Sequence, residues 1–465
     1  MMKINVRYIA SMAALVALPA VAQDINTAYF DEGFLYQHSL NPAAGNEQNY
    51  IALPIIGNMN IKMMGDFGYN DVVRKNPLYP TMSDKKMTSF LNPYLNDALD
   101  GFNTGDNRIS GQAKVAVLSA GFKGLGGYNT LELNVRAKIN GVIPYELLRM
   151  ACDLKNEHYD IGTVRADGIA FSELAFGHSR DINDKLRLGA KLKLLLGIGN
   201  ASLKMDNVQA DLNSNDSWTV AADAESHVSM KGFEYESGTK EYDIRPGEYQ
   251  YVRDVNVHNG GLDGIGLAAD LGLIYKINEQ WSLRGALLDL GFINWKHDFY
   301  AKNTAESFNF NGFHDVSMKK HDDENLEAQT DRYVDQMADF AHLVDQGDQG
   351  GRTTGIGATL NVGASYTLPS YKPLSFGLLA TQRINGDYSW TEGRLSANIT
   401  PNNWFDAALS FSVSSFAASL GWMVNFHPKG FNFFVGMDQL LGKCSKELIP
   451  LNSNASISMG CNIVW

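Results

Sequence analysis

Apolar and polar residues alternate through most of this chain. In residues 131–139 (LELNVRAKI), the odd positions are apolar, whereas Glu132, Asn134, Arg136 and Lys138 occupy the even ones. A period of two places these sets on opposite faces of a β-strand. The same alternation recurs in residues 185–196, 264–275, 393–399, 404–413, 419–426, 431–441 and 454–465. The pattern predicts an all-β protein.

The connections between these segments are of two kinds. Short, turn-like connections rich in Gly, Asn, Asp and Pro occur at 123–129, 181–184, 277–280, 368–373, 400–403 and 427–430. Long ones span 67–107, 142–163, 199–262 and 297–353. A soluble sandwich also alternates, but it does not explain this layout. Short periplasmic turns and long extracellular loops predict a transmembrane antiparallel β-barrel of about 14 strands.

The N-terminus has the features of an export signal. Lys3 and Arg7 precede an apolar run at 8–18, and Ala20-Val21-Ala22 provides a cleavage site before Gln23. The run is too short to span a bilayer. We therefore expect residues 1–22 to be a cleaved signal peptide. Export and the strand pattern together predict the cell outer membrane, with outer-membrane lipid and the barrel-assembly machinery as partners.

Composition excludes several classes of protein. The formal net charge is −12, which argues against nucleic acid as a partner. Cys152, Cys444 and Cys461 are too few and too scattered for a disulfide framework or a zinc site. The sequence does not decide whether Cys152 and Cys444 form a disulfide bond. We expect no metal and no cofactor.

The phase of the alternation predicts what faces the lumen. A membrane barrel turns its apolar face to lipid and its polar face inward. The last strand then returns to the periplasm, and Trp465 lies in the aromatic girdle at that interface. On neighbouring strands, the predicted lumenal charge cluster consists of Glu132, Arg136, Lys138, Glu173, Arg187, Lys191 and Lys193.

Three short motifs resemble sites of catalysis or binding. His178 and Ser179 are adjacent, so a strand points them to opposite faces and they share no hydrogen bond. The acidic run 322–324 lacks the spaced ligands of a calcium loop, and the glycine-rich stretch 260–266 opens a strand and no helix. We therefore do not expect an enzyme.

Two of the long connections contain helix-like stretches. Residues 88–102 and 331–346 space their apolar residues by three and four. These stretches predict either lid or partner-binding helices, or loop helices that pack over the barrel mouth.

One stretch resembles a known superfamily. Residues 39–61 (SLNPAAGNEQNYIALPIIGNMNI) resemble the entry of barrels related to the FadL long-chain fatty-acid transporters. Residues 139–150 and 171–203 resemble an uncharacterised outer-membrane barrel family within that superfamily, a domain of unknown function. The resemblance implies that residues 23–48, with the plug motif Asn41, Pro42 and Ala43, plug the lumen of a barrel formed by 49–465. An ordinary Asn-Pro turn is the alternative.

Two function classes follow from these features. The resemblance implies a passive channel or transporter for small hydrophobic or amphipathic solutes. The acidic long connections allow an alternative, a non-transporting barrel scaffold for surface display, adhesion or secretion partners.

Overall fold

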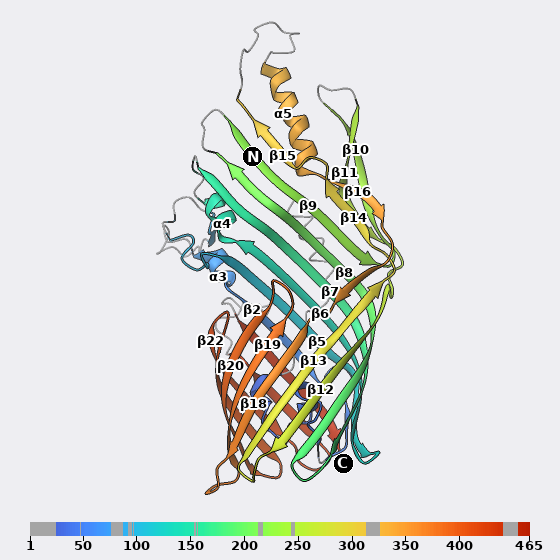
Figure 1. Cartoon of the computed structure of the whole chain (residues 1–465), viewed down its shortest axis with the longest axis vertical. Coiled ribbons are helices and arrows are strands. Elements are labelled where there is room, and N and C mark those ends of the chain that lie inside the picture. Colours follow the sequence, from blue (N-terminus) through green and yellow to red (C-terminus); the bar gives the residue numbers. More distant parts are fainter. Residues whose placement is uncertain are drawn as a thin grey trace.

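A computed structural model describes most of the chain, and Figure 1 shows its course. The described residues are 25–46, 48–75, 87–91, 95, 97–152, 155, 157–212, 217–242, 247–312, 326–439 and 454–465. The predicted signal peptide, residues 1–22, lies outside them, and so does Cys444, the candidate partner of Cys152.

The wall is a closed antiparallel β-barrel of 14 strands, as the alternation and turn pattern predict. Two of the 14 positions are each shared by two short strands, because the chain leaves the ladder and re-enters it. In order around the wall, the strands are β1 (Tyr50–Ala52) with β2 (Met59–Gly65), β5 (Asp106–Gly124), β6 (Gly127–Pro144), β7 (His158–Asp181), β8 (Leu186–Asp211), β12 (Gly264–Lys276), β13 (Trp281–Trp295), β17 (Arg352–Gly355) with β18 (Ala358–Thr367), β19 (Leu374–Ile384), β20 (Trp390–Asn402), β21 (Phe405–Ser414), β22 (Ala418–Phe426), β23 (Asn432–Met437) and β24 (Ala455–Val464).

The last strand closes the barrel against the first. In β24, Val464 lies opposite Tyr50 of β1, and Met459 lies opposite Met59 of β2. Closure satisfies the backbone groups of both edges, which hydrocarbon would otherwise leave unpaired at several kcal/mol each. Asn49 and Trp465 complete the junction with two mutual backbone hydrogen bonds of 3.2 and 3.1 Å.

The two faces of the wall differ in polarity, in the phase that the sequence predicts. On β8, the outward Leu192 is 69 % exposed, whereas the flanking inward residues Lys191 and Lys193 are 3 % and 6 % exposed. Trp465 is 67 % exposed at the end that carries the short turns, the short-turn end. No described helix is long and apolar enough to cross a membrane.

The wall is much taller on one side than on the other (Figure 1). Strands β7 and β8 have 24 and 26 residues, whereas β19 has 11. The long connection predicted at 199–262 is thus largely strand, and the one at 142–163 consists of strand ends and a helix among its described residues, which corrects the expectation of loops. Beyond the membrane no lipid face requires an apolar residue at every second position, so the alternation that marks a wall strand is weak there. One face of β7 and β8 is still buried, in an apolar cluster that includes Tyr159, Ile161 and Val208. The additional elements on this side are α4 (Tyr145–Cys152), β9 (Trp218–Met230), β10 (Phe233–Glu241), β11 (Glu248–Val257), β14 (Phe299–Asn303), β15 (Ser307–Phe310), α5 (Leu326–Ala341) and β16 (Leu343–Asp348).

The helix predictions are correct in one case and wrong in the other. Helix α5 covers most of the stretch predicted at 331–346, but residues 343–348 pair with β14 as a strand. The stretch predicted at 88–102 contains no helix among its described residues. Instead, β4 (Met87–Ser89) pairs with β3 (Val73–Lys75), next to a short helix α3 (Tyr69–Val72).

Candidate functional site in the barrel lumen

The inward faces of five wall strands bring charges of both signs together. Arg136 of β6 donates to Glu173 of β7 at 2.8 Å and to Asp289 of β13 at 2.6 Å. Lys193 of β8 lies 2.7 Å from both Asp270 and Asp289 and 3.8 Å from Glu173. Three carboxylates thus surround two cations, and we call these five residues the central ion cluster. Removing one member of such a buried group leaves an uncompensated charge.

A break in strand register places two of these carboxylates. The β12–β13 pairing shifts between Ala269 and Leu271, and Asp289 has a φ of 59°. This left-handed conformation is uncommon for a residue other than glycine. The backbone N–H of Asp289 donates to the Asp270 carboxylate at 2.7 Å, which supports the bulge from inside the barrel. Bulges of this kind re-aim a side chain.

A second ion group connects the wall to the N-terminal part of the chain. Glu132 lies 3.1 Å from Lys191 and 3.2 Å from the His38 ring. The other ring nitrogen of His38 lies 2.9 Å from the Tyr50 hydroxyl, which in turn lies 2.9 Å from the hydroxyl of Ser119. All five side chains are nearly fully buried. The lumen therefore holds polar groups in paired form at this level.

The predicted charge cluster divides into separate groups. Arg136, Glu173 and Lys193 share the central ion cluster, whereas Glu132 and Lys191 form the group around His38. Lys138 instead donates to the carbonyl of Ile356 at 2.7 Å. Arg187 lies nearer the short-turn end, where it donates to Asp181 at 3.2 Å. His178 lies on the outward phase of β7 and contacts Asn129 at 2.9 Å.

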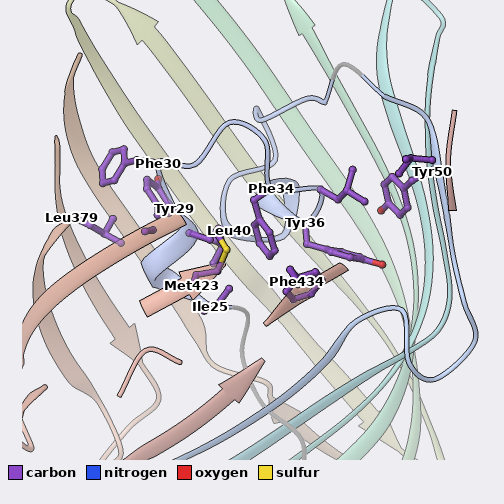
Figure 2. Packing of buried hydrophobic residues seen from close by; sticks show 14 of the residues in the cluster. Ile25, Tyr29, Phe30, Phe34, Tyr36, Leu40, Tyr50, Leu379, Met423 and Phe434 are labelled. Atoms are coloured by element: carbon purple, nitrogen blue, oxygen red, sulfur yellow. The ribbon is translucent and has the colours of Figure 1, made fainter. Parts of the chain in front are cut away.

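Residues 25–46, which we call the lumen segment, lie inside the barrel. Figure 2 shows Tyr29, Phe34, Tyr36 and Leu40 of this segment among side chains of the wall. The Phe34 ring packs edge-on against Phe434 of β23, with ring centroids 4.9 Å apart. All four side chains are at most 2 % exposed. Fully burying a large apolar side chain contributes roughly 1.5–3 kcal/mol, so this packing holds the segment strongly.

Glycines on the inward face of the wall make room for the segment. An alanine Cβ at Gly377 would lie 2.1 Å from Phe30, and one at Gly436 would lie 2.5 Å from Ile25. Such distances are shorter than non-bonded carbon atoms tolerate. Six such wall glycines, on six strands, contact the segment: Gly189, Gly272, Gly363, Gly377, Gly421 and Gly436. We call this set the glycine seat.

Wall side chains bind the backbone at both ends of the segment. The N–H groups of Asn26 and Thr27 donate to the Asp438 carboxylate at 2.9 and 2.7 Å. Asp438 also lies 3.5 Å from Arg394, whose guanidinium bonds to Glu392 at 2.9 Å. A carboxylate that accepts two backbone N–H groups and faces a cation is a strong anchor.

The plug motif forms the other anchor. Asn41 donates to the backbone carbonyl of Leu273 at 3.2 Å, and its side-chain oxygen accepts the N–H of Ala43 at 3.0 Å. Arg187 donates to the carbonyl of Ala43 at 2.8 Å. Pro42 lies against Gly189, where a Cβ would lie 2.1 Å from the Pro42 carbonyl oxygen. The motif is thus a turn whose backbone contacts the wall.

The middle of the segment carries a buried carboxyl group. Asp31 is 2 % exposed, and burial together with the neighbouring Asp406 carboxylate raises the pKa of Asp31 well above its usual range. Burial likewise raises the pKa of Tyr29 to about 12. Two buried acids near each other favour a state in which one is protonated.

Apolar side chains fill the lumen on the other side of the central ion cluster. Phe171, Leu195, Ile293, Trp295 and Ile356 pack together, and each is at most 2 % exposed. The residues predicted from the sequence for these inward faces are all charged. Leu195 continues the inward phase of Lys191 and Lys193, so this signal was present in the same strand.

Comparison with known proteins places the chain in a family. The model of the family of unknown function DUF5723 matches residues 42–438. The chain belongs to this family. No curated protein matches the chain at a significant level.

Solved structures resemble this DUF5723 barrel only distantly. They include the toluene transporter TbuX of Ralstonia pickettii, with a TM-score of 0.39, 9 % identity, and coverage of 97 % of this chain and 95 % of that one. The toluene transporter TodX of Pseudomonas putida has a TM-score of 0.37 and 8 % identity, over 96 % and 93 % of the two chains. A FadL homologue of Pseudomonas aeruginosa has a TM-score of 0.37 and 10 % identity, over 97 % and 95 %. These scores are too low to carry an argument about the solute.

Proposed function

We propose that this protein is an outer-membrane channel for small or amphipathic solutes, which the lumen segment closes. The observation that carries the proposal is the way in which the segment is held. Among the described residues, every backbone–backbone hydrogen bond of 25–46 stays within the segment. Each hydrogen bond given above between the segment and the wall has a side chain as at least one of its partners. The segment can therefore leave without breaking the β-ladder that keeps the barrel closed.

The contents of the lumen also suit a gate. The segment carries its own apolar surface, and the glycine seat matches that surface in shape. Wall side chains alone fill the interior of a barrel of about 8 strands, but a 14-stranded barrel is wider, so closing its lumen requires a further filling. A passive channel that is closed at rest needs a filling that can move out of the lumen as one piece.

Conductance of purified protein in planar bilayers tests the proposal. The intact protein is expected to conduct poorly, and deletion of residues 26–44 is expected to raise the conductance. Deleting the β10–β11 hairpin at 233–257, which pairs outside the barrel wall, is the matched control and should leave the conductance low. A wide, steady pore in the intact protein would contradict closure by the segment.

A scaffold for surface partners is the second candidate function. The tall side of the wall, with β9, β10, β11 and α5, supports it, because these elements extend the sheet beyond what a membrane span requires. A segment-deleted barrel that stays folded and still does not conduct would favour the scaffold over the channel.

The outer-membrane location is tested separately. Outer-membrane barrels commonly resist detergent until they are heated, so unheated and boiled samples should migrate differently on a gel. Recovery of the protein in the soluble periplasmic fraction, without a heat-dependent shift, would rule out this location.

A further inference from the structure

A cavity of about 810 Å³ lies at the short-turn end, between the lumen segment and the strand ends. Among the residues that the structure describes, its lining includes five lysine and arginine side chains and three carboxylates. The chain as a whole has a formal charge of −12, so this described lining carries the opposite sign. A concave site with an excess of one charge concentrates small ions of the opposite charge. The basic residues are Lys123, Lys185, Arg187, Lys276 and Arg284.

Two of these arginines lie at the same level of the wall. Ile274 of β12 is directly opposite Arg187 of β8 on one side and Arg284 of β13 on the other. Adjacent strands are spaced by about 4.8 Å, so the Cα atoms of the two arginines lie about 10 Å apart. Ile274 also lines the cavity and lies between them as an apolar patch.

The present partners of Arg284 differ in how firmly they are held. Its side chain is 4 % exposed, and one nitrogen donates to the Tyr29 carbonyl at 3.2 Å. A second donates to Glu32 at 2.9 Å, but the Glu32 side chain is 83 % exposed. The Nε atom has no hydrogen-bond partner among the described residues. This buried guanidinium therefore has one N–H donor without a hydrogen-bond partner among the described residues, and the carboxylate paired with it is exposed.

Arg187 likewise binds a carbonyl of the lumen segment and an exposed carboxylate, and its third nitrogen donates to the Ser179 hydroxyl at 3.2 Å. Its Nε donates to the Ala43 carbonyl of the lumen segment at 2.8 Å. Its outer nitrogen donates to Asp181 at 3.2 Å, and the Asp181 side chain is 68 % exposed. Exposed ion pairs of this kind contribute little, so an arriving carboxylate can replace Asp181 at small cost.

We propose that this cavity binds a linear dicarboxylate, with one carboxylate on Arg187, the other on Arg284, and the aliphatic middle across Ile274. The inference rests on the proposed function in one respect, that the ligand is a solute of this channel. Arginine binds carboxylates through paired N–H donors, which suits an anion that arrives from solution. Because both arginines also hold carbonyls of the lumen segment, the bound ligand competes with the anchors of the segment.

Calorimetric titration of the full-length protein in detergent tests the site. The probe is azelate, whose two carboxylates lie about 10 Å apart when the chain is extended. We expect azelate to bind and nonanoate, with one carboxylate, to bind about tenfold more weakly or worse, since a hydrogen bond to a charged group is lost. The neutral diol of the same length should not bind. Equal binding of azelate and nonanoate would overturn the proposal.

Variants separate a defined site from diffuse attraction. Arg187→Gln and Arg284→Gln should each weaken azelate binding by about tenfold or more. Lys123→Gln is the matched control, because Lys123 lines the same cavity on β5, separated from β8 by two strands. We expect Lys123→Gln to change the azelate affinity by no more than about twofold, because Lys123 is exposed and ions in the solvent screen its charge. A loss with Lys123→Gln as large as with the arginine variants would contradict a defined site.

Arg284→Gln also removes an anchor of the lumen segment, so weaker binding by that variant has two explanations. Glu32→Gln leaves this anchor in place and is therefore informative. Glu32 is exposed, so its substitution does not threaten folding, and it competes with the ligand for Arg284. We expect Glu32→Gln to tighten azelate binding by about two- to fivefold, the worth of an exposed ion pair. Weaker binding by this variant would overturn the proposal.

Conductance distinguishes failure of the site from failure of the channel. Azelate added at the short-turn side should raise the open fraction of the intact protein, and Arg187→Gln should abolish this response. Binding of azelate by a protein that never conducts, even with residues 26–44 deleted, would refute the proposed function and leave the dicarboxylate site standing. Conductance after that deletion, without azelate binding by the intact protein, would refute the site alone.

Discussion

The glycine seat allows closure of the lumen to be tested with a single methyl group. In Gly377→Ala, the new Cβ would lie 2.1 Å from the Phe30 ring. The ring cannot simply turn away, because Gly363 lies against its far edge, where a Cβ would be 2.8 Å away. The Arg284 guanidinium also lies over the ring, 5.5 Å from its centroid. We therefore expect the whole segment to be displaced.

The size of the effect follows from the cost of overpacking. An extra methyl group in a closely packed site typically costs about 1–3 kcal/mol. That cost applies to the closed state only, because the released segment no longer contacts Gly377. At about 1.4 kcal/mol per tenfold change, the ratio of open to closed barrels should rise by a factor of about 5 to 150. Single-channel recording measures this ratio as the open probability.

A second glycine provides the matched control. Gly393 lies on the next strand, β20, opposite Ala380 of β19, and a Cβ there would meet no atom within 4 Å. Gly393→Ala changes the same chemical group in the same type of strand and should leave the open probability unchanged. If the two variants behave alike, or if Gly377→Ala folds normally and stays closed, the seat does not control closure.

Three further predictions concern the wall and the pH response. Glu173→Gln should lower the free energy of unfolding by about 3–5 kcal/mol, the cost of breaking a buried pair; Glu173 is 2 % exposed, so the loss should be the same in high salt, and a loss that shrinks with salt would indicate a wet lumen. Leu192→Arg should destabilise the barrel by about 2–4 kcal/mol in lipid, as measured by the temperature at which the folded gel band disappears, and no loss would contradict the strand phase. The raised pKa of Asp31 means that the closed state retains a proton that the released segment gives up, so closure weakens as pH rises from about 4 through the raised pKa. Conductance should therefore fall on acidification, and Asp31→Asn should remove this dependence; the same response in Asp31→Asn would refute the role of Asp31.

The sequence predicts the barrel well because every wall strand of a membrane barrel must satisfy the same simple requirement. Lipid requires apolar residues at every second position, and this alternation is visible in single segments such as 131–139. The elements beyond the membrane do not obey that rule. The pattern therefore predicts loops at β9 and at the extra length of β7 and β8. The apolar residues there, such as Tyr159 and Val208, pack in a local cluster and do not follow the strict alternation of a lipid-facing strand.

The lumen is harder to predict, because its contacts join residues far apart in the chain. The phase places Glu173 and Lys193 on inward faces, but it gives no hint that Asp289 points the same way. The Asp289 carboxylate reaches Lys193 because the strand register breaks here and Asp289 has a φ of 59°. Alternation in the sequence cannot reveal this feature. Similarly, the glycine seat is invisible without the segment that fills it, since glycine in a strand has several explanations.

The short connection between the lumen segment and β1 determines what happens after release. Gln48 and Asn49 precede β1 at the short-turn end, where Asn49 bonds to Trp465. A freed chain of residues 25–48 would form a tail with an end-to-end distance of about 27 Å. A tail tethered this closely is at an effective concentration in the millimolar range near its own seat. Reclosing is thus a first-order event within one molecule, whose rate does not depend on how many copies of the protein the membrane holds.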